Sequence, residues 1–144
     1  MAINHHPKAG QILLCDFSQG FKEPEMIKKR PVLVITPPFS ERPNLVTVLA
    51  LSTKQPNKIM NYHYKIPKNS MPQIDKYQSS ETWLKGDMIY TVGFHRLERI
   101  KLGKRDKNTG KRVYFDNKLG REQMREIYSC ALYGLNLGRL SVHL

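Results

Sequence analysis

The chain has 144 residues and a formal net charge of +12 at pH 7, with 24 Lys and Arg against 12 Asp and Glu. This length suits one domain over residues 1–144, and no apolar run reaches the roughly 20 residues of a membrane-spanning helix, so we expect a cytoplasmic protein with no membrane partner. The two cysteines lack a CxxC spacing and the five histidines are not spaced as metal ligands, so we expect no disulfide framework, no metal and no cofactor.

Three core strands are predicted in the first half of the chain. Gln11 to Asp16 is a short apolar run, Pro31 to Thr36 is almost continuous in Val, Leu and Ile, and Leu45 to Leu51 is a third apolar run. Short runs of this kind, bounded by turn residues, predict buried strands. A polar loop over residues 18–29 joins the first two strands, and loops on a rigid scaffold often carry functional residues.

Arg30 stands where a basic run meets the second of these strands. Pro31 disfavours the helical conformation for the residue before it, and a proline is tolerated at the first residue of a strand because that position needs no ladder donor. We therefore expect Arg30 to lie on extended, ordered backbone at the start of a core strand.

The second half is predicted to contain two further strands and a hairpin. Tyr62 to Ile66 alternates between polar and apolar residues, and Met88 to Val92 is a short apolar run. A basic hairpin is predicted over about residues 97–115, because Asn108 and Gly110 can supply the positive φ that a hairpin turn needs.

A C-terminal helix is predicted over about residues 119–137. Apolar residues recur there every three or four positions from Met124 to Leu135, and Gly138 is available as a stop. Cys15 and Cys130 fall inside apolar patterns, so we expect both to be reduced core residues. Five to seven short strands and one helix predict a mainly β fold with a small, strongly curved sheet.

The excess of positive charge is concentrated in two segments, residues 22–30 and 96–121. Like charges in a small domain repel one another and destabilise the compact state. Their retention therefore predicts a polyanionic partner, which can be RNA, DNA or an acidic protein. The alternative is a solvated basic face without a partner.

Three short motifs in a fixed order resemble a known family. Gly10-Gln11-Ile12 precedes Arg30-Pro31, and Ser52-Thr53 follows at the end of the third predicted strand. In this order they are similar to the PemK/MazF family of toxin endoribonucleases, from about residue 10 through the C-terminal helix. The resemblance is clear in the first half and weakens between residues 54 and 118, where the family has a shorter region than the predicted hairpin.

The resemblance implies an SH3-like small barrel of the PemK/MazF/CcdB type. It also implies a homodimer whose RNA groove spans both subunits, and a cognate acidic antitoxin whose largely disordered segment occupies that groove. DNA would be a partner only indirectly, through the antitoxin.

Arg30 and Ser52 are the first candidates for catalysis. Cleavage of RNA without a metal needs positive charge beside the developing phosphorane, and a guanidinium can hold two phosphate oxygens at once. Arg30 suits this role, with phosphate binding alone as the alternative. By resemblance, the catalytic threonine of the MazF proteins maps onto Ser52, and Thr53 also matches. A hydroxyl here can donate to phosphate, or it can simply form the turn.

Glu25 precedes Arg30 by five residues, as the loop glutamate of the family precedes its Arg-Pro. Two roles are open for it: orienting Arg30 through a salt bridge, or acting as the base, which requires partial burial. As a histidine near a predicted strand end, His95 is a candidate proton carrier or a plain surface residue. The residues that we expect to bind RNA are Lys28, Lys29, Lys54 and His95.

The chain departs from the Kid/PemK subgroup of the family at three positions. That subgroup carries an arginine and an aspartate on a later strand, where this chain has Tyr90 and Val92, and its loop histidine falls on Pro24. The acid and the base of that subgroup are therefore not inherited.

Together with the basic charge, the resemblance to the PemK/MazF family implies the toxin of a type II toxin–antitoxin system. The predicted activity is metal-independent, sequence-specific cleavage of single-stranded RNA by attack of the 2′-hydroxyl, which leaves a 2′,3′-cyclic phosphate and a 5′-hydroxyl and inhibits translation and growth. The alternatives are a CcdB-like gyrase-binding toxin and a non-catalytic basic barrel that binds nucleic acid.

Overall fold

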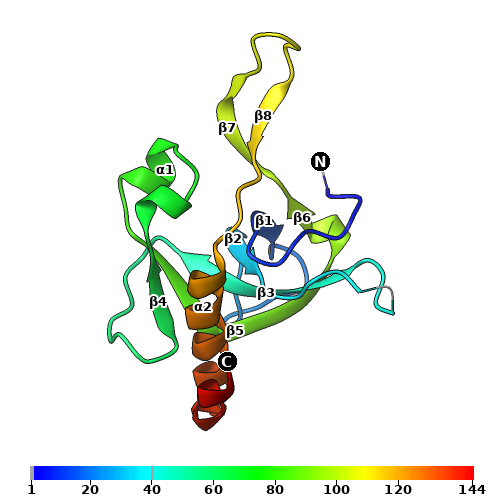
Figure 1. Ribbon diagram of the computed structural model, residues 1–144. Helices are drawn as coiled ribbons and strands as arrows, with labels where there is room; N and C mark the ends of the chain where they lie inside the picture. Colours follow the sequence, from blue (N-terminus) through cyan, green and yellow to red (C-terminus); the bar gives the residue numbers. More distant parts are fainter. Residues whose placement is uncertain (1, 40) are drawn as a thin grey trace.

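The computed structural model describes residues 2–39 and 41–144. Its main element is an antiparallel sheet of six strands in the order β4-β5-β3-β2-β1-β6, with the helix α2 against β5 (Figure 1). The strands are β1 (Ile12–Asp16), β2 (Lys29–Val34), β3 (Leu45–Ser52), β4 (His63–Ile66), β5 (Thr82–Gly93) and β6 (Leu97–Glu98).

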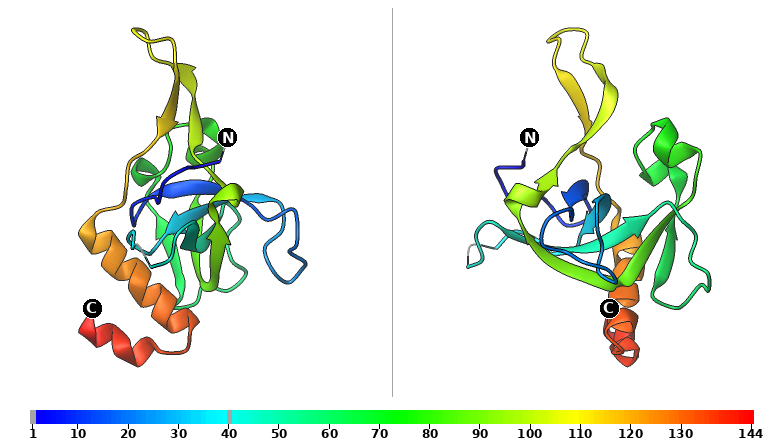
Figure 2. Two further views of the ribbon diagram at one scale, coloured as in Figure 1. Left: turned by 90° about the vertical axis from the view of Figure 1, so that its right-hand side faces the viewer. Right: turned by 180° about the vertical axis from the view of Figure 1, so that it is seen from behind.

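Two more strands form a separate sheet. These are β7 (Ile100–Arg105) and β8 (Arg112–Phe115), a hairpin that projects from the body of the molecule (Figures 1 and 2). It lies within the segment 97–115 that the sequence predicted. The helical elements are α1 (Asp75–Gln78), α2 (Arg121–Gly134), η1 (Lys68–Ser70), η2 (Phe94–Arg96) and η3 (Gly138–His143), the last three being 3-10 helices.

The predicted fold class, mainly β with a C-terminal helix, is confirmed. The sheet is strongly curved but is not closed into a barrel, because no pairing in the described part of the chain joins the edge strands β4 and β6 (Figure 2). Both edge strands are short, with 4 and 2 residues. We expected a small barrel, and the structure instead has a curved sheet that stays open between β4 and β6.

The apolar core has two parts, one on each face of the sheet. Successive residues of a strand point to opposite faces. Leu33 accordingly belongs to the larger cluster, which also contains residues of α2, while Val32 and Val34 belong to the smaller cluster on the other face. The loop between β1 and β2 covers this smaller cluster through Phe21 and Met26. β2 is therefore buried on both faces, as its almost continuous apolar sequence predicts.

Both cysteines are buried and free, as expected. Burial raises the pKa of the Cys15 thiol to about 12 and that of the Cys130 thiol to about 11. Both thiols are therefore protonated near neutral pH, and neither is an activated nucleophile.

Two expectations about the ends of elements are wrong. Pro31 is the third residue of β2, not the first, and its missing N–H is tolerated because β2 pairs with β3 only from Val32 onward. Gly138 does not end the C-terminal helix. α2 ends at Gly134, and the chain turns at Asn136, whose φ is +61°.

The strand predicted over residues 88–92 is also longer than expected. β5 has 12 residues and pairs with β3 along its length and with β4 through its first part. The register against β3 shifts between Leu49 and Ala50, which is the mark of a bulge. Lys85 pairs with both β3 and β4, while Gly86, Asp87 and Met88 form the bulge and have no partner in the β3 register. The N–H of Gly86 donates to the carbonyl oxygen of Tyr62 at 2.8 Å.

α2 packs on β5 through two glycines. A Cβ atom at Gly134 would lie 2.2 Å from the carbonyl oxygen of Gly86, and a Cβ atom at Gly86 would lie 2.4 Å from the carbonyl oxygen of Cys130. The two backbones are therefore too close for any larger residue. The hydroxyl of Tyr128 adds a second anchor by donating to the carbonyl oxygen of Ile35 at 2.7 Å.

Gly134→Ala should destabilise the protein, although alanine has the higher helix propensity by about 1 kcal/mol. The added methyl group must push two backbones apart, and overpacking of this kind typically costs about 1–3 kcal/mol. Chemical denaturation measures the free energy of unfolding. The control Glu126→Ala, at an exposed position of the same helix, should stay within about 0.5 kcal/mol of wild type. A Gly134→Ala variant as stable as wild type would contradict the close packing.

Candidate active site

Arg30 is the second residue of β2 and is partly buried. It lies directly across from Cys15 on β1. Its Nε donates a long hydrogen bond of 3.4 Å to the carbonyl oxygen of Ile27, and no described residue accepts a hydrogen bond from its terminal Nη atoms. The backbone of Arg30 is thus fixed by strand pairing, while its outer donors are available to an anion.

Ser52 and Thr53 lie where β3 ends. Ser52 is only 8% exposed, and its Oγ accepts a hydrogen bond of 3.1 Å from the N–H of Lys54. Ser52 therefore has the turn-forming role that serine often takes at such positions. A hydroxyl that accepts still keeps its own proton. Ser52 can hold the turn and donate to a phosphate oxygen at the same time.

The strand register relates Arg30 to Ser52. β2 and β3 are antiparallel, with Val32 across from Ala50. Continued by two residues, the same register sets Arg30 across from Ser52, on strands about 5 Å apart. Because residues two apart on a strand share a face, Arg30 shares the face of Val32, where the smaller core cluster lies.

The loop between β1 and β2 covers that face and carries Glu25. The N–H of Met26 in this loop donates to the hydroxyl of Tyr90 at 2.8 Å. Burial raises the pKa of Tyr90, the bond from Met26 opposes the rise, and the Glu25 carboxylate adds to it, so Glu25 lies within electrostatic reach of that hydroxyl. Glu25 is exposed and forms no ion pair with Arg30 in the described structure. Neither the salt bridge nor the burial required of a base is present in the single chain.

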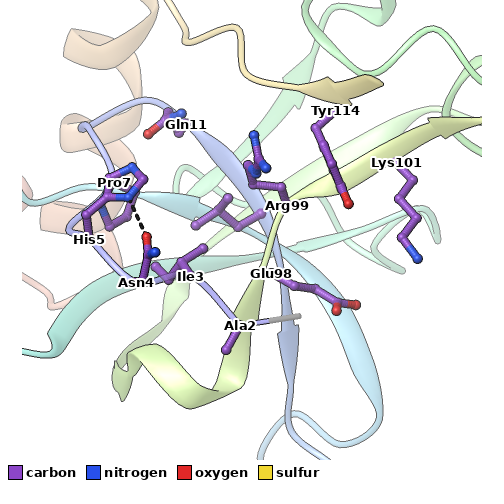
Figure 3. A pocket seen from close by; sticks show the side chains of 11 residues that line it. Ala2, Ile3, Asn4, His5, Pro7, Gln11, Glu98, Arg99, Lys101 and Tyr114 are labelled. Atoms are coloured by element: carbon purple, nitrogen blue, oxygen red, sulfur yellow. Dashed lines mark hydrogen bonds between the residues drawn. The ribbon is translucent and has the colours of Figure 1, made fainter. Parts of the chain in front are cut away.

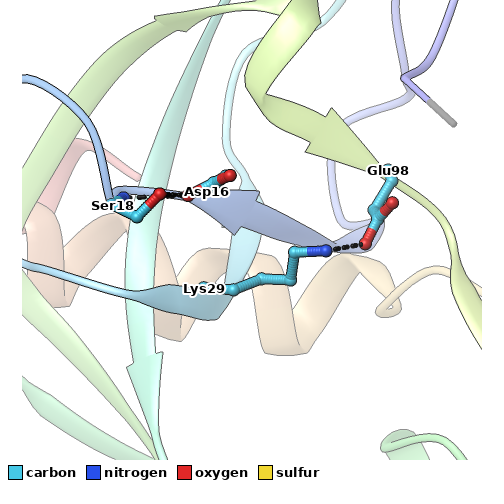
Figure 4. Close-up of polar contacts among 4 residues, drawn as sticks. All are labelled: Asp16, Ser18, Lys29 and Glu98. Carbon is cyan, nitrogen blue, oxygen red and sulfur yellow. Dashed lines mark hydrogen bonds and ion pairs between the residues drawn. The ribbon is translucent and has the colours of Figure 1, made fainter.

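Lys29 and His95 lie apart from Ser52. The Nζ of Lys29 is 2.6 Å from Oε1 of Glu98 on β6, beside the Asp16–Ser18 hydrogen bonds (Figure 4). This hydrogen-bonded ion pair raises the pKa of Lys29 and lowers that of Glu98. His95 lines a small pocket of about 80 Å³ together with Lys29 and Glu98. His95 follows the end of β5, where Gly93 pairs with Leu45 at the opposite end of β3 from Ser52, so the structure does not bring His95 to Ser52.

Lys28 sets the entry of the chain into β2. It has a φ of +72°, in the left-handed region, which costs a non-glycine residue on the order of 1 kcal/mol. Its carbonyl oxygen accepts a hydrogen bond of 2.8 Å from the N–H of Phe17, and the residue is exposed. Backbone strain of this kind persists only where the surroundings hold it. The turn before Arg30 is therefore ordered.

Sequence reasoning missed two residues that hold the loop, Tyr90 and Arg96. Nη1 of Arg96 donates to the carbonyl oxygens of Asp16 and Gln19 at 3.0 and 2.9 Å, and its guanidinium lies 4.8 Å from the ring centre of Phe21. In the sequence, Arg96 was only one cation of a basic segment. Bonds to distant main-chain oxygens leave no local pattern, so no sequence signal identified this role.

The face formed by Arg30, Ser52 and the loop provides hydrogen-bond donors and positive charge. A guanidinium with open donors and a hydroxyl that keeps its proton are suited to a phosphodiester. Among residues 2–39 and 41–144, no three or more His, Cys, Asp or Glu side chains are grouped as metal ligands. No helix in these ranges has the length and apolarity to cross a membrane.

Comparison with known proteins identifies a family and a relative. Residues 8–129 match the model of the PemK-like, MazF-like toxin of type II toxin–antitoxin systems. This match covers most of the chain, including β2, β3 and the loop. An uncharacterised protein from Haemophilus influenzae is 33% identical over 106 residues, which are 67% of this chain and 72% of that protein.

Solved toxin structures share the fold. MazF from Deinococcus radiodurans superposes with a TM-score of 0.59 and 13% identity, over 92% of this chain and 99% of that one. An endoribonuclease in complex with its cognate antitoxin, from a mycobacterial species, gives a TM-score of 0.58 and 17% identity, over 92% of this chain and 97% of that one.

Tyr90→Phe tests how the loop is held, since it removes the acceptor for the Met26 N–H and keeps the ring. The Met26 amide should exchange with solvent up to about tenfold faster, because one hydrogen bond contributes about 0.5–1.5 kcal/mol. Hydrogen exchange followed by NMR measures this rate. Tyr133→Phe, at an exposed tyrosine on α2, should leave it unchanged. If Met26 keeps its full protection in Tyr90→Phe, apolar contacts alone hold the loop.

Proposed function

This chain belongs to the PemK-like, MazF-like toxins of type II toxin–antitoxin systems, and we propose that it is a metal-independent endoribonuclease that cuts single-stranded RNA at a short sequence. Cleavage of messenger RNA would stop translation and growth until an antitoxin neutralises the enzyme. The observation that supports this proposal is the β2–β3 register, which pairs Val32 with Ala50. Continued by two residues, it sets Arg30 across from Ser52, on the face that the Glu25 loop covers.

In the proposed reaction, the 2′-oxygen of one nucleotide attacks the adjacent phosphorus, and the 5′-oxygen of the next nucleotide leaves. A base takes the proton of the 2′-hydroxyl, and an acid returns a proton to the leaving oxygen. The products are a 2′,3′-cyclic phosphate and a 5′-hydroxyl. Single-stranded RNA is favoured because an unstacked strand can adopt the in-line geometry and expose its bases.

Arg30 stabilises the developing negative charge in this scheme. Its Nη atoms donate to two phosphate oxygens, and a guanidinium stays protonated, so it supplies charge and not a proton. Ser52 donates its hydroxyl proton to a phosphate oxygen, since its Oγ already accepts the bond from Lys54. Thr53, at the same strand end, contributes a second hydroxyl.

We assign the base to Glu25. Its carboxylate is exposed in the single chain, so bound RNA must bury it to favour proton transfer at neutral pH. Lys28 and Lys54 are exposed just before β2 and just after β3, beside Arg30 and Ser52, and would bind flanking phosphates. Lys29 contributes less, because Glu98 already holds its ammonium group.

We further propose a homodimer and an acidic antitoxin as partners, in the cytoplasm, with DNA reached only through the antitoxin. The net charge of +12 supports an acidic partner. One structural relative is an endoribonuclease in complex with its cognate antitoxin. Light scattering of the purified chain, alone and mixed with the antitoxin, measures both assemblies.

Arg30→Ala should lower the rate of RNA cleavage in EDTA by about 10²–10³-fold, the usual loss when a group that stabilises transition-state charge is removed. Ser52→Ala should lower it by about 10- to 150-fold, which corresponds to the ~1.5–3 kcal/mol of a hydrogen bond to a charged group. The measurement uses a long single-stranded RNA with mapping of the new ends.

The matched control for these variants is Arg139→Ala, which removes one exposed cation from η3 and should leave cleavage unchanged. Replacing the ribose by deoxyribose on the 5′ side of the cut should abolish cleavage, because the attacking oxygen is lost. If wild-type protein leaves the RNA intact in EDTA, the proposed nuclease activity is wrong. The alternatives are then a gyrase-binding toxin and a non-catalytic barrel that binds nucleic acid.

Glu25→Gln tests whether Glu25 is the base or only orients Arg30, because the two roles predict different pH dependences of kcat/KM. If Glu25 is the base, the wild-type kcat/KM falls as the carboxylate becomes protonated on the acid side, and the variant loses both most of its rate and this acid limb. Glu23→Gln, two residues away on the same loop, is the control. A variant that is uniformly slower with an unchanged pH profile would assign Glu25 to orientation.

A further inference from the structure

The β7–β8 hairpin is a charged element that the proposed cleavage site does not use. Its outer residues, 103–112, are all exposed, and none of them has an apolar side chain. The hairpin projects from the body of the molecule (Figure 1). In the described part of the chain, no ion pair engages its cations, which are Lys101, Lys104, Arg105, Lys107, Lys111 and Arg112.

The positive charges within the hairpin repel one another and lower the stability of the isolated hairpin. Arg105 lies directly across from Arg112, and like charges in this position destabilise a strand pair. The carboxylate of Asp106 shapes the turn instead of pairing with them, since it accepts the N–H groups of Asn108 and Thr109 at 2.8 and 2.9 Å. A two-stranded ribbon is marginally stable alone. A bound polyanion would relieve this repulsion.

The base of the hairpin is firmly attached to the body. Ile100 and Phe115 face each other across the strands, and both are buried in the larger core. Beside them, the guanidinium of Arg99 lies 4.1 Å from the ring centre of Tyr114. This contact covers one face of the Tyr114 ring, and Phe115 is buried. The outer residues 103–112 therefore offer charge but no aromatic side chain on which a base could stack.

The basic surface continues into two hollows at the base of the hairpin. One, of about 280 Å³, lies between the N-terminal segment, Arg99 just before the hairpin, and Lys101 of β7, with Glu98 as its acidic residue (Figure 3). The other, of about 650 Å³, shares Arg99 and is also lined by Lys8 and Lys118, with Asp116 as its acidic residue. Cations thus follow one another from the body of the molecule to the tip of the hairpin.

The sheet places this surface near the proposed cleavage site. Cys15 on β1 pairs with Arg30 on one side and with Leu97 on the other. Two strand spacings therefore separate Arg30 from Leu97, and the hairpin begins three residues later at Ile100. Its root lies within about 20 Å of Arg30. An RNA strand several nucleotides longer than the cut site can reach both.

We propose that the β7–β8 hairpin is an arm that binds the sugar-phosphate backbone of RNA outside the cleaved segment. This inference rests on the proposed RNA substrate. Contacts to a phosphate backbone need only cations and hydrogen-bond donors. Protein interfaces instead bury an apolar and aromatic centre, which residues 103–112 do not offer to an acidic protein segment. The arm raises affinity for long RNA without reading its sequence.

A binding experiment compares two variants that remove the same charge. The hairpin variant is Lys104→Gln/Lys107→Gln/Lys111→Gln, and the control is Lys65→Gln/Lys76→Gln/Arg139→Gln, whose residues are exposed on other elements. The probe is a long single-stranded RNA with 2′-O-methyl groups, which cannot be cleaved by 2′-hydroxyl attack. The hairpin variant should reduce the slope of log affinity against log salt by about 2, because each single-strand phosphate contact contributes about 0.7. The control should keep the wild-type slope.

A cleavage experiment measures the consequence for activity. In the hairpin variant, kcat/KM should fall about tenfold or more on long RNA and stay at the wild-type value on an oligonucleotide that covers only the cut site. The charge-conserving variant Lys104→Arg/Lys107→Arg/Lys111→Arg should restore both the salt slope and the activity on long RNA. Restoration by arginine excludes misfolding of the arm as the cause.

Three results would overturn the proposal that the hairpin binds RNA. These are equal salt slopes of RNA affinity in the hairpin and control variants, equal losses of kcat/KM on long and short RNA, or weakened antitoxin binding with the salt slope for RNA unchanged. The last would assign the hairpin to a protein. Wild-type protein that binds the methylated RNA with the predicted slope but cleaves no RNA would reject the nuclease and leave the arm supported.

Discussion

The pairing of β2 with a neighbour on each side is the constraint on which the proposed site depends. Val32 and Leu33 point into separate core clusters, so a slip of one residue would turn each apolar side chain to the wrong face. With the register fixed in this way, Arg30 can enter the strand at only one place. Continued two residues beyond the Val32–Ala50 pair, the same register sets Ser52, at the end of β3, across from Arg30.

The loop over this face depends on contacts that reach far along the chain. Tyr90 accepts the N–H of Met26, and Arg96 donates to the main chain on either side of the loop's start. These contacts use polar atoms of β5 and η2 to order a segment that carries Glu25. The MazF structure from Deinococcus radiodurans shares the fold. In this chain, the β7–β8 hairpin carries a large part of the excess positive charge. Binding charge and cleavage chemistry thus occupy separate but neighbouring parts of one small domain.

Much of the fold could be predicted because it follows from local patterns. The apolar runs of β1, β2 and β3 and the three- and four-residue spacing in α2 are visible without any knowledge of contacts. The length of β5 was missed because Lys85, Gly86 and Asp87 look like a loop. Lys85 pairs with β3 and β4, and Gly86 and Asp87 form a bulge between the two paired parts of β5. The open sheet was missed for a related reason, since closure depends on whether two edge strands meet.

The sequence by itself determined the class of fold, the placement of Arg30 at a core strand and the order of Arg30 and Ser52, because local propensity and apolar period act over a few residues. Tertiary structure decided the partners of the charged side chains. Lys29 pairs with Glu98, His95 lies beside the end of β3 opposite to Ser52, and Glu25 forms no ion pair with Arg30 in the described structure. Such pairings depend on distances between segments far apart in the chain, which strand order and register set and which no local pattern encodes.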